Sequence, residues 1–238
     1  MSGSGPSRSG ENELSSNARH LRRRSTCCAE CWTIVGDGPS TARLFVAVDL
    51  DQAARRVVTG AAVQIAERLG AVDGIRVSWV RPRNLHLTVR FLGEVGRETR
   101  GRLQTSLARR WALAPFELAL APAGVFPVFG APRVVWVGVR DCGGAFERLT
   151  PELDARLAAA GATVSDDAMH FTPHVTIGRV RRAPNRGRDI REAAAAVSVE
   201  PERWRVTDVT LYESRPTDGP PTYVARAAGP LAAGTASA

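Results

Sequence analysis

The 238-residue chain contains no lysine, so all 32 of its cationic side chains are arginine. It also contains no apolar run close to the roughly 20 residues that a membrane-spanning helix needs. The segment from Cys28 to Val35 is too short and too polar for the core of a secretion signal. We therefore expect a soluble, cytoplasmic protein with no membrane partner.

The arginines give the chain a net charge of +8. Guanidinium groups carry planar donors that suit phosphate oxygens, and a basic surface attracts polyanions. However, the absence of lysine beside abundant Ala, Gly and Arg is typical of a GC-rich genome, which explains the composition better than a function does. The charge is thus compatible with a nucleic acid partner without being evidence for one.

Cysteine is scarce, and three of the four cysteines, Cys27, Cys28 and Cys31, crowd near the N-terminus. Cys28 and Cys31 form a single C-x-x-C, with only Cys27 and His20 nearby. A structural zinc site needs four ligands at matched spacing, so we expect neither a metal nor a cofactor. A metal or redox role for this cluster remains a minor alternative. Cys142 is expected to be an ordinary small residue near a turn.

The composition divides the chain into three parts. Residues 1–42 begin with a stretch rich in Ser, Gly and Asn and are expected to be a disordered tail. Residues 43–229 carry alternating strand and helix patterns and are expected to form a single domain with two similar halves. Residues 230–238, rich in Ala and Gly, are expected to be a frayed C-terminus.

Hydrophobic periodicity predicts a mixed order of strands and helices within this domain. Several strands follow one another without an intervening helix, which favours antiparallel pairing and an α+β fold. Asp51 and Gly161 stand where a helix start and a helix end are expected. The expected strands are 44–48, 77–80, 85–92, 116–121, 133–139, 174–180, 204–212 and 222–227, and the expected helices are 51–69, 97–111, 144–160 and 190–197.

Two of the expected strands carry a His-x-Thr unit, and the two units lie 88 residues apart. Side chains alternate between the two faces of a strand. In the first strand the apolar residues should face the core and the polar residues should face the other way. The apolar set is Leu85, Leu87, Val89 and Phe91, and the polar set is His86, Thr88 and Arg90.

The second strand repeats this arrangement. Val175 and Ile177 should face the core, while His174 and Thr176 face the other way and Gly178 leaves space beside them. A single H-x-T carries little weight, because roughly half a match is expected by chance in a chain of this length. The matched pair, one in each half, carries more.

A third match, His170-Phe171-Thr172, precedes the second unit by four residues. Pro173 interrupts it, and proline is more natural at the start of a strand than inside one. We therefore assign the second strand unit to His174 and Thr176, and expect His170 in a loop or at the rim of a site.

Two imidazoles in one cleft can perform general acid–base chemistry near neutral pH, one accepting a proton and the other donating one. Threonine hydroxyls beside them can donate hydrogen bonds to phosphate oxygens. These are the groups needed to open a cyclic phosphodiester, with arginine to stabilise the developing charge. Such a reaction requires no metal.

Four blocks of the chain resemble the 2H phosphoesterase superfamily, and specifically the RNA 2′,3′-cyclic phosphodiesterases, which are also called 2′–5′ RNA ligases. The blocks are RLFVAV at 43–48, NLHLTVRFLG at 84–93, PRVVWVG at 132–138 and FTPHVTIGR at 171–179. The resemblance extends over roughly residues 43–227. It implies a bilobal α+β fold in which two antiparallel sheets face a central cleft and helices pack outside.

The resemblance also implies an activity, namely hydrolysis of an RNA 2′,3′-cyclic phosphate to a 2′-phosphomonoester, with 2′–5′ ligation as the reverse reaction. It implies His86 as the proton donor to the leaving 3′ oxygen and His174 as the proton acceptor that activates water. Thr88 and Thr176 would bind the phosphate. The expected partners are RNA with 2′,3′-cyclic phosphate ends or cyclic nucleotides, and the expected state is a monomer.

Three further residues are candidates for substrate binding. Arg179 follows the second unit, but in an ideal strand it would point away from Thr176, so its contribution requires local twist or a bulge. Arg90 has the better parity, yet it could instead pair with an acid. Phe45 could contact a base, although a place in the core fits it as well.

Two alternative functions remain open from the sequence. One is a 2H enzyme for a small cyclic phosphodiester derived from a nucleotide, because the motifs define the chemistry better than the substrate. The other is a catalytically idle RNA-binding module that uses the arginine-rich surface. A pure binder would not need both histidines and both threonines, which argues against the second.

Overall fold

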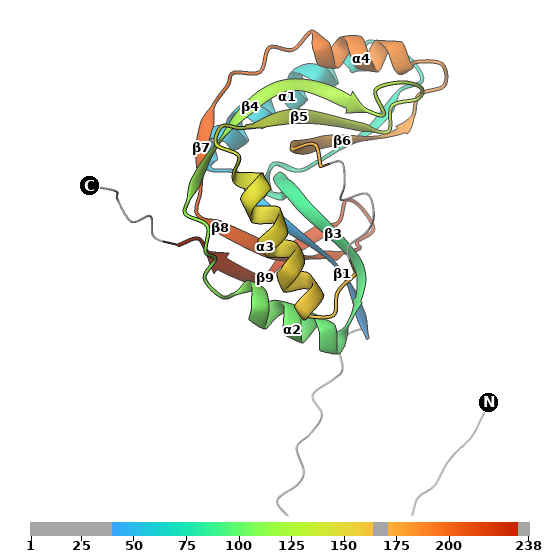
Figure 1. Ribbon diagram of the computed structural model, residues 1–238. Coiled ribbons are helices and arrows are strands. Elements are labelled where there is room, and N and C mark those ends of the chain that lie inside the picture. The colour runs from blue at the N-terminus through green and yellow to red at the C-terminus, as the bar shows by residue number, and fades with distance from the viewer. Residues whose placement is uncertain (1–39, 164–170, 233–238) are drawn as a thin grey trace, which may run out of the picture. The chain divides into compact units, whose positions relative to one another are not determined.

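The computed structural model of the chain describes residues 40–163 and 171–232 (Figure 1). The expectations for the N-terminal tail, for Cys27, Cys28 and Cys31, for His170 and for residues 233–238 lie outside these described residues. Within them the chain forms nine strands and four α-helices. No helix of this part is long and apolar enough to cross a membrane.

The helices and strands follow the order expected from the sequence, with one additional strand. The strands are β1 (Thr41–Asp49), β2 (Arg76–Trp79), β3 (His86–Gly96), β4 (Phe116–Phe126), β5 (Val134–Asp141), β6 (His174–Arg182), β7 (Arg203–Val206), β8 (Asp208–Arg215) and β9 (Thr222–Pro230). The helices are α1 (Gln52–Gly70), α2 (Arg97–Leu107), α3 (Ala145–Ala159) and α4 (Gly187–Ala195), and a short 3₁₀ helix covers Pro82–Asn84.

The strands form one antiparallel sheet in the order β7-β4-β5-β6-β3-β1-β8-β9, with β2 paired to β6. The central pair, β3 and β6, is joined at one ladder position only, Leu87 opposite Val175. The predicted α+β class is therefore confirmed. The two expected sheets are the halves of one curled sheet that narrows to a single pair of residues at its middle.

The helices link the two halves of the sheet to each other. Helix α1 follows β1 but lies with α4 over the half that contains β4, β5 and β6, and it contacts β6 and β7 (Figure 1). Helix α3 follows β5 but packs with α2 on the half that contains β1, β3, β8 and β9. Because each crossover helix covers the opposite half, neither half can bury its apolar face without the other.

Helix α1 shows why these residues form a helix at this place. The Asp51 carboxylate accepts a hydrogen bond from the backbone N–H of Ala54 at 2.8 Å, which caps the helix where its N-terminus was predicted. The helix buries one face at helical spacing, formed by Ala54, Val58, Ala61, Ile65 and Leu69. At the end of α3, Gly161 adopts a φ of 77°, which a residue without a side chain tolerates best.

The ends of the domain lie slightly beyond the predicted boundaries of 43 and 229. Strand β1 begins at Thr41, where Thr41 and Ala42 pair with Gly96 and Val95 of β3. Strand β9 reaches Pro230, and the next side chain, Leu231, is buried. Backbone pairing and burial thus extend past the points where the hydrophobic pattern ended.

Two expected elements were wrong in extent. The helix predicted over 97–111 ends at Leu107, because Trp111 leaves the helix to enter the core, where its backbone N–H donates to the Pro230 carbonyl at 3.0 Å. The strand predicted over 204–212 is two strands, β7 and β8, which pair with β4 and β1 respectively. One strand cannot pair with both ends of the sheet, so the chain breaks at Thr207 and passes from one half to the other.

Strand β3 departs from simple alternation after Thr88. Opposite it in β1, Ala47 pairs with Thr88 and Val46 pairs with Arg90, so Val89 is an extra residue, a β-bulge. Beyond the bulge the two faces exchange: Arg90 is buried at 7% exposure, and Phe91 is 59% exposed. The prediction that Phe91 faces the core and Arg90 shares the face of His86 was therefore wrong.

Strand β6 has a bulge at the equivalent place. In its pairing with β5, Trp136 is opposite Thr176 and Val135 is opposite Gly178, so Ile177 is the extra residue. Ile177 lies 88 residues after Val89, the same separation as between the two histidines. Arg179 is thereby brought to the face of Thr176, which is the distortion that its predicted role required.

The buried Arg90 is held by an ion pair on the far side of the sheet from the histidines. Its Nε and Nη2 donate to the two carboxylate oxygens of Asp154 on α3, each at 2.9 Å, and its Nη1 donates to the Val89 carbonyl at 3.0 Å. Arg90 therefore pairs with an acid, the second of the two outcomes left open from the sequence, and it ties α3 to β3.

Replacing Asp154 with Asn should leave this buried guanidinium without its counter-charge. We expect a loss of about 2 kcal/mol in the free energy of unfolding, below the roughly 3–5 kcal/mol of fully enclosed pairs because Asp154 remains 41% exposed. Urea denaturation measures it. As a control, Glu94→Gln breaks the exposed Arg43–Glu94 pair, which is 3.6 Å long, and should change stability by less than about 0.5 kcal/mol. Equal losses of unfolding free energy in the two variants would show that the buried Arg90 pair stabilises the fold no more than the exposed pair does.

Candidate active site

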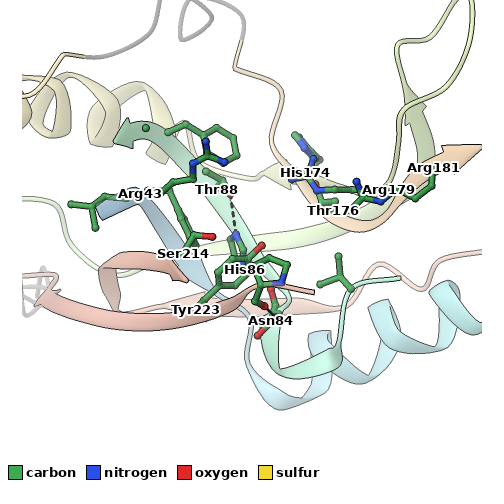
Figure 2. Close-up of a pocket in the computed structure, with 16 residues that line it drawn as sticks. Arg43, Asn84, His86, Thr88, His174, Thr176, Arg179, Arg181, Ser214 and Tyr223 are labelled. Atoms are coloured by element: carbon green, nitrogen blue, oxygen red, sulfur yellow. Dashed lines mark hydrogen bonds between the residues drawn. The ribbon is translucent and has the colours of Figure 1, made fainter. Parts of the chain in front are cut away.

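The two His-x-Thr units face one cavity of about 450 Å³ (Figure 2). His86 and Thr88 reach it from β3, and His174 and Thr176 reach it from β6. Arg179 and Phe45 also line it, whereas Arg90 does not. The other lining residues that matter below are Arg43, Asn84, Phe91, Arg181, Ser214, Pro221 and Tyr223. The structure thus brings together six of the seven residues singled out in the sequence.

Hydrogen bonds define the orientation of the His86 ring. Its Nδ1 lies 2.7 Å from the Asn84 carbonyl, which can only accept, so we assign the ring proton to Nδ1. In the neutral ring, Nε2 then accepts a hydrogen bond from the Thr88 hydroxyl at 3.0 Å. The nitrogen that can exchange a proton with substrate is therefore the one beside Thr88.

The loop before His86 is fixed by two polar side chains. The Asn84 amide donates to the Pro221 carbonyl at 2.8 Å, which connects this loop to the loop between β8 and β9. From α1, Arg55 Nη1 donates to the carbonyls of Pro82 and Leu85, at 2.6 and 3.0 Å. The ring of His86 therefore sits on a backbone that is held from two directions.

His174 repeats the arrangement of His86. Its Nδ1 lies 2.7 Å from the carbonyl of Thr172, two residues upstream, as the Asn84 carbonyl is for His86. The edge of the ring meets Phe126, with the centroids 5.1 Å apart. Because Nδ1 is engaged by a backbone carbonyl in both rings, Nε2 is in each the nitrogen that can exchange a proton with a bound ligand.

Aromatic rings enclose His86. Phe45, only 3% exposed, stacks against it with the centroids 4.8 Å apart, and Tyr223 meets it edge-on at 5.1 Å. Behind Phe45, the Tyr212 hydroxyl donates to the Asp49 carboxylate at 2.8–2.9 Å. Phe45 is therefore buried and supports the His86 ring. Of the two alternatives for Phe45, a base contact and a place in the core, this position fits the second.

Burial lowers the pKa of both histidines below 6.5, and it outweighs the hydrogen bonds from Nδ1 to carbonyl, which raise the pKa. The charge of Arg179 lowers the pKa of both rings as well, so one guanidinium acts on both halves of the site. Asp49 raises the pKa of His86 but does not act on His174. Both rings are thus mainly neutral at neutral pH in the free protein, and only His86 has a carboxylate that favours its charged form.

Arg179 is the cation best placed to meet an anion in this cavity. Its side chain is exposed, and within residues 40–163 and 171–232 its guanidinium forms no ion pair or hydrogen bond.

The neighbouring Gly178 is required for a different reason from the one expected. A Cβ there would lie 2.7 Å from Val77 and 3.1 Å from the Trp79 ring, so the glycine admits β2 against β6.

Sequence reasoning missed several cavity residues. Phe91 was placed on the wrong face by strict alternation, and Tyr223 lies on β9, far from either motif in the sequence. Arg43 and Arg181 stood among many arginines without a distinguishing signal. Of these residues, only Phe91 could have been predicted to face the cavity. A bulge was considered for Arg179 in the second strand, and the same bulge in the first strand turns Phe91 to that face.

The described residues hold no group of three or more His, Cys, Asp or Glu side chains with the proximity that a metal ion needs. Cys142 is exposed in the turn between β5 and α3, close to its expected setting.

Matched His-x-Thr strands that face one cavity of a curled antiparallel sheet define a 2H phosphoesterase. The sequence profile of the 2′-5′ RNA ligase superfamily matches residues 62–218, so the chain belongs to that superfamily, as the resemblance predicted. A protein of Archaeoglobus fulgidus named RNA 2′,3′-cyclic phosphodiesterase is 36% identical over 181 residues, which cover 76% of this chain and 96% of the relative. The protein of that name from Methanothermobacter thermautotrophicus is 34% identical over 182 residues, or 76% and 94% of the two chains.

Among solved structures, Escherichia coli LigT in complex with 3′-AMP superposes with a TM-score of 0.59 at 30% sequence identity. The superposition covers 80% of this chain and 98% of LigT. The names of the relatives agree with the predicted enzyme class, a hydrolase of phosphodiester bonds.

Replacing Arg179 with Gln tests whether one cation controls both histidines. Both His86 and His174 should titrate below pH 6.5 in the wild-type protein, and both pKa values should rise in the variant because a positive charge near each ring is lost. Imidazole C–H resonances followed by NMR against pH measure this, with assignments from single His→Gln variants. Arg203→Gln, on the remote strand β7, is the matched control. A rise at one ring only would show that Arg179 does not face both.

Proposed function

We propose that the protein hydrolyses the 2′,3′-cyclic phosphate at the 3′ end of RNA to a 2′-phosphomonoester, using His86 and His174 as acid and base. The observation that carries the proposal is the approach of the two His-x-Thr units to one cavity that Arg179 also lines. The printed names of the relatives support the substrate class.

Each group has one step to perform in this reaction. The phosphate lies between the two strands, where the hydroxyls of Thr88 and Thr176 donate to its non-bridging oxygens and Arg179 neutralises its charge. His174 Nε2 accepts a proton from water as the water oxygen bonds to phosphorus. The bond from phosphorus to the 3′ oxygen breaks, and His86 Nε2–H gives its proton to that oxygen. The products are a 2′-phosphomonoester and a free 3′-hydroxyl.

The charges around the two rings support this assignment of roles. A proton donor must hold its proton before the reaction, and the Asp49 carboxylate favours the charged form of His86. His174 has no such partner among the groups that act on its pKa, whereas Arg179 favours the neutral form of both rings. In the free protein the Thr88 hydroxyl donates to His86 Nε2, so substrate binding must turn this hydroxyl towards the phosphate.

Hydrolysis of an oligoribonucleotide that ends in a 2′,3′-cyclic phosphate tests the proposal directly. With EDTA present we expect a 2′-phosphate product, and His86→Ala and His174→Ala should each lower kcat by about 10²–10⁴-fold, the usual worth of a positioned acid or base. His170→Ala should cost far less and serves as the control histidine. Activity that EDTA abolishes and zinc restores would refute the metal-independent reaction.

A substrate with sulfur in place of the 3′ oxygen separates the acid from the base. A thiolate leaves without protonation, so the loss caused by His86→Ala should largely disappear on this substrate. The loss caused by His174→Ala should persist, because water must still be activated. Chromatographic separation of the thiol product gives the rates. Rescue of His174→Ala instead of His86→Ala would reverse the two roles.

The same groups would catalyse 2′–5′ ligation, in which a 5′-hydroxyl replaces water as the nucleophile that attacks the cyclic phosphate and the 3′ oxygen again leaves. We expect hydrolysis to dominate because water is far more concentrated. A small cyclic nucleotide is the second candidate substrate, favoured by a cavity whose volume of about 450 Å³ is near the lower end of small-ligand sites. The proposed enzyme acts as a monomer, with all of its site residues on one chain.

A further inference from the structure

A second hollow continues the active-site cavity along the sheet. It measures about 860 Å³ and shares Arg43, Ser214 and Pro221 with the cavity. Its other walls include Thr41, Glu94 and Arg215, so it lies over the start of β1 and the loop between β8 and β9. Figure 2 shows Arg43 and Ser214 at the edge of the cavity on the His86 side. We call this second hollow the adjacent groove.

We propose that the adjacent groove binds the nucleotide that precedes the terminal one, on its 5′ side. The phosphodiester that links these two nucleotides would contact Arg43. The inference rests on the proposed function and specifies its substrate as an RNA strand of at least two nucleotides. The cavity, at about 450 Å³, is near the lower end of small-ligand sites, so a longer strand that ends there must leave it, and the groove shares three wall residues with it.

Arg43 is free to accept such a phosphate. Its side chain is 68% exposed, and its partner Glu94 is 56% exposed at an N–O distance of 3.6 Å. Exposed pairs of this kind contribute little to stability, so the guanidinium can exchange Glu94 for a phosphate at small cost. Its planar donors suit two phosphate oxygens at once.

The buried carboxylate of the groove, Glu213, does not repel a bound anion, because its charge is already balanced. Glu213 is 5% exposed, and its two oxygens accept hydrogen bonds from Arg215 Nε at 2.9 Å and Arg226 Nε at 2.6 Å. Burial raises its pKa, but the bonds from the two arginines outweigh this and lower the pKa overall. The ionised carboxylate is thus matched by two guanidiniums, and the three groups together carry a charge of +1. Among the described residues that line the groove, Glu94 is then the one carboxylate that competes with a phosphate for Arg43.

Comparison of two substrates isolates the groove from the catalytic cavity. One is adenosine 2′,3′-cyclic phosphate, and the other is the dinucleotide adenylyl-(3′→5′)-adenosine with a 2′,3′-cyclic phosphate end. The quantity of interest is the ratio of kcat/KM for the dinucleotide to kcat/KM for the mononucleotide. It is measured in the wild-type protein and in Arg43→Gln, Glu94→Gln and Arg203→Gln.

Arg203→Gln is a matched control. The Arg203–Glu117 pair, at 3.8 Å with exposures of 67% and 57%, closely resembles the Arg43–Glu94 pair but lies on β7 and β4. Glu94→Gln is a control of the opposite kind, because it breaks the same ion pair as Arg43→Gln while leaving the cation in place.

We expect Arg43→Gln to lower the ratio by about five- to tenfold, the order of one charge-assisted contact that is partly exposed. Glu94→Gln should raise it or leave it unchanged, and Arg203→Gln should not alter it. The salt dependence should weaken as well: the log–log slope of dinucleotide kcat/KM against salt should fall by about 0.7 in Arg43→Gln, as expected for one contact to a single strand.

Equal losses in Arg43→Gln and Glu94→Gln would overturn the inference, because the ion pair and not a phosphate contact would then explain both. An unchanged ratio in Arg43→Gln would overturn it as well. Product binding by calorimetry, with adenosine 2′-phosphate and with the dinucleotide 2′-phosphate, separates this failure from that of the proposed function. If neither cyclic substrate is hydrolysed but Arg43→Gln still lowers the ratio of affinities by the same factor, the proposed reaction fails and the groove stands.

Discussion

The backbone pairing of Leu87 with Val175 joins the two halves of the sheet, and the approach of the two His-x-Thr units depends on it. Both side chains are buried, so the residues that flank them in each strand must point to the opposite face. The strands are antiparallel, which turns His86 towards the Thr176 side and His174 towards the Thr88 side. One ladder position with buried, non-polar partners therefore makes two distant sequence units into one site, and the same narrow junction leaves the space beside it that the cavity occupies.

Two bulges then decide what else reaches that space. The extra residues Val89 and Ile177 stand at equivalent positions, and each exchanges the faces of its strand just beyond the threonine. As a result Phe91 and Arg179 face the cavity, an aromatic ring from one half and a cation from the other. The residues that turn inward instead are Arg90 and Gly178. Arg90 is paired with Asp154, and Gly178 has no side chain and so leaves space for the side chains of β2. The two halves thus share a backbone plan and differ in what each contributes.

The sequence predicted the features that depend on local chemistry. The helix start at Asp51, the helix end at Gly161 and the strand positions of both His-x-Thr units follow from side-chain type and spacing, and the structure has them where they were expected. It did not predict features that depend on distant partners. The bulge at Val89 is a property of its register against β1, and the end of α2 depends on the burial of Trp111 in the core. The break at Thr207 arises because β7 and β8 pair with opposite ends of the sheet. Tyr223 enters the site through a strand that no motif marked.

The charge balance of the site connects ligand binding to proton transfer. Burial and Arg179 both lower the pKa of the two imidazoles and so favour their neutral forms in the free protein, whereas the proposed reaction requires one protonated ring. A bound phosphodiester brings a negative charge that offsets Arg179, and it is then favourable for one ring to take up a proton. The Asp49 carboxylate acts on His86 and not on His174, so it favours proton uptake at His86. In the proposed reaction the donor would therefore be charged mainly when a phosphate is bound, and the buried rings need not carry an uncompensated positive charge in the free protein.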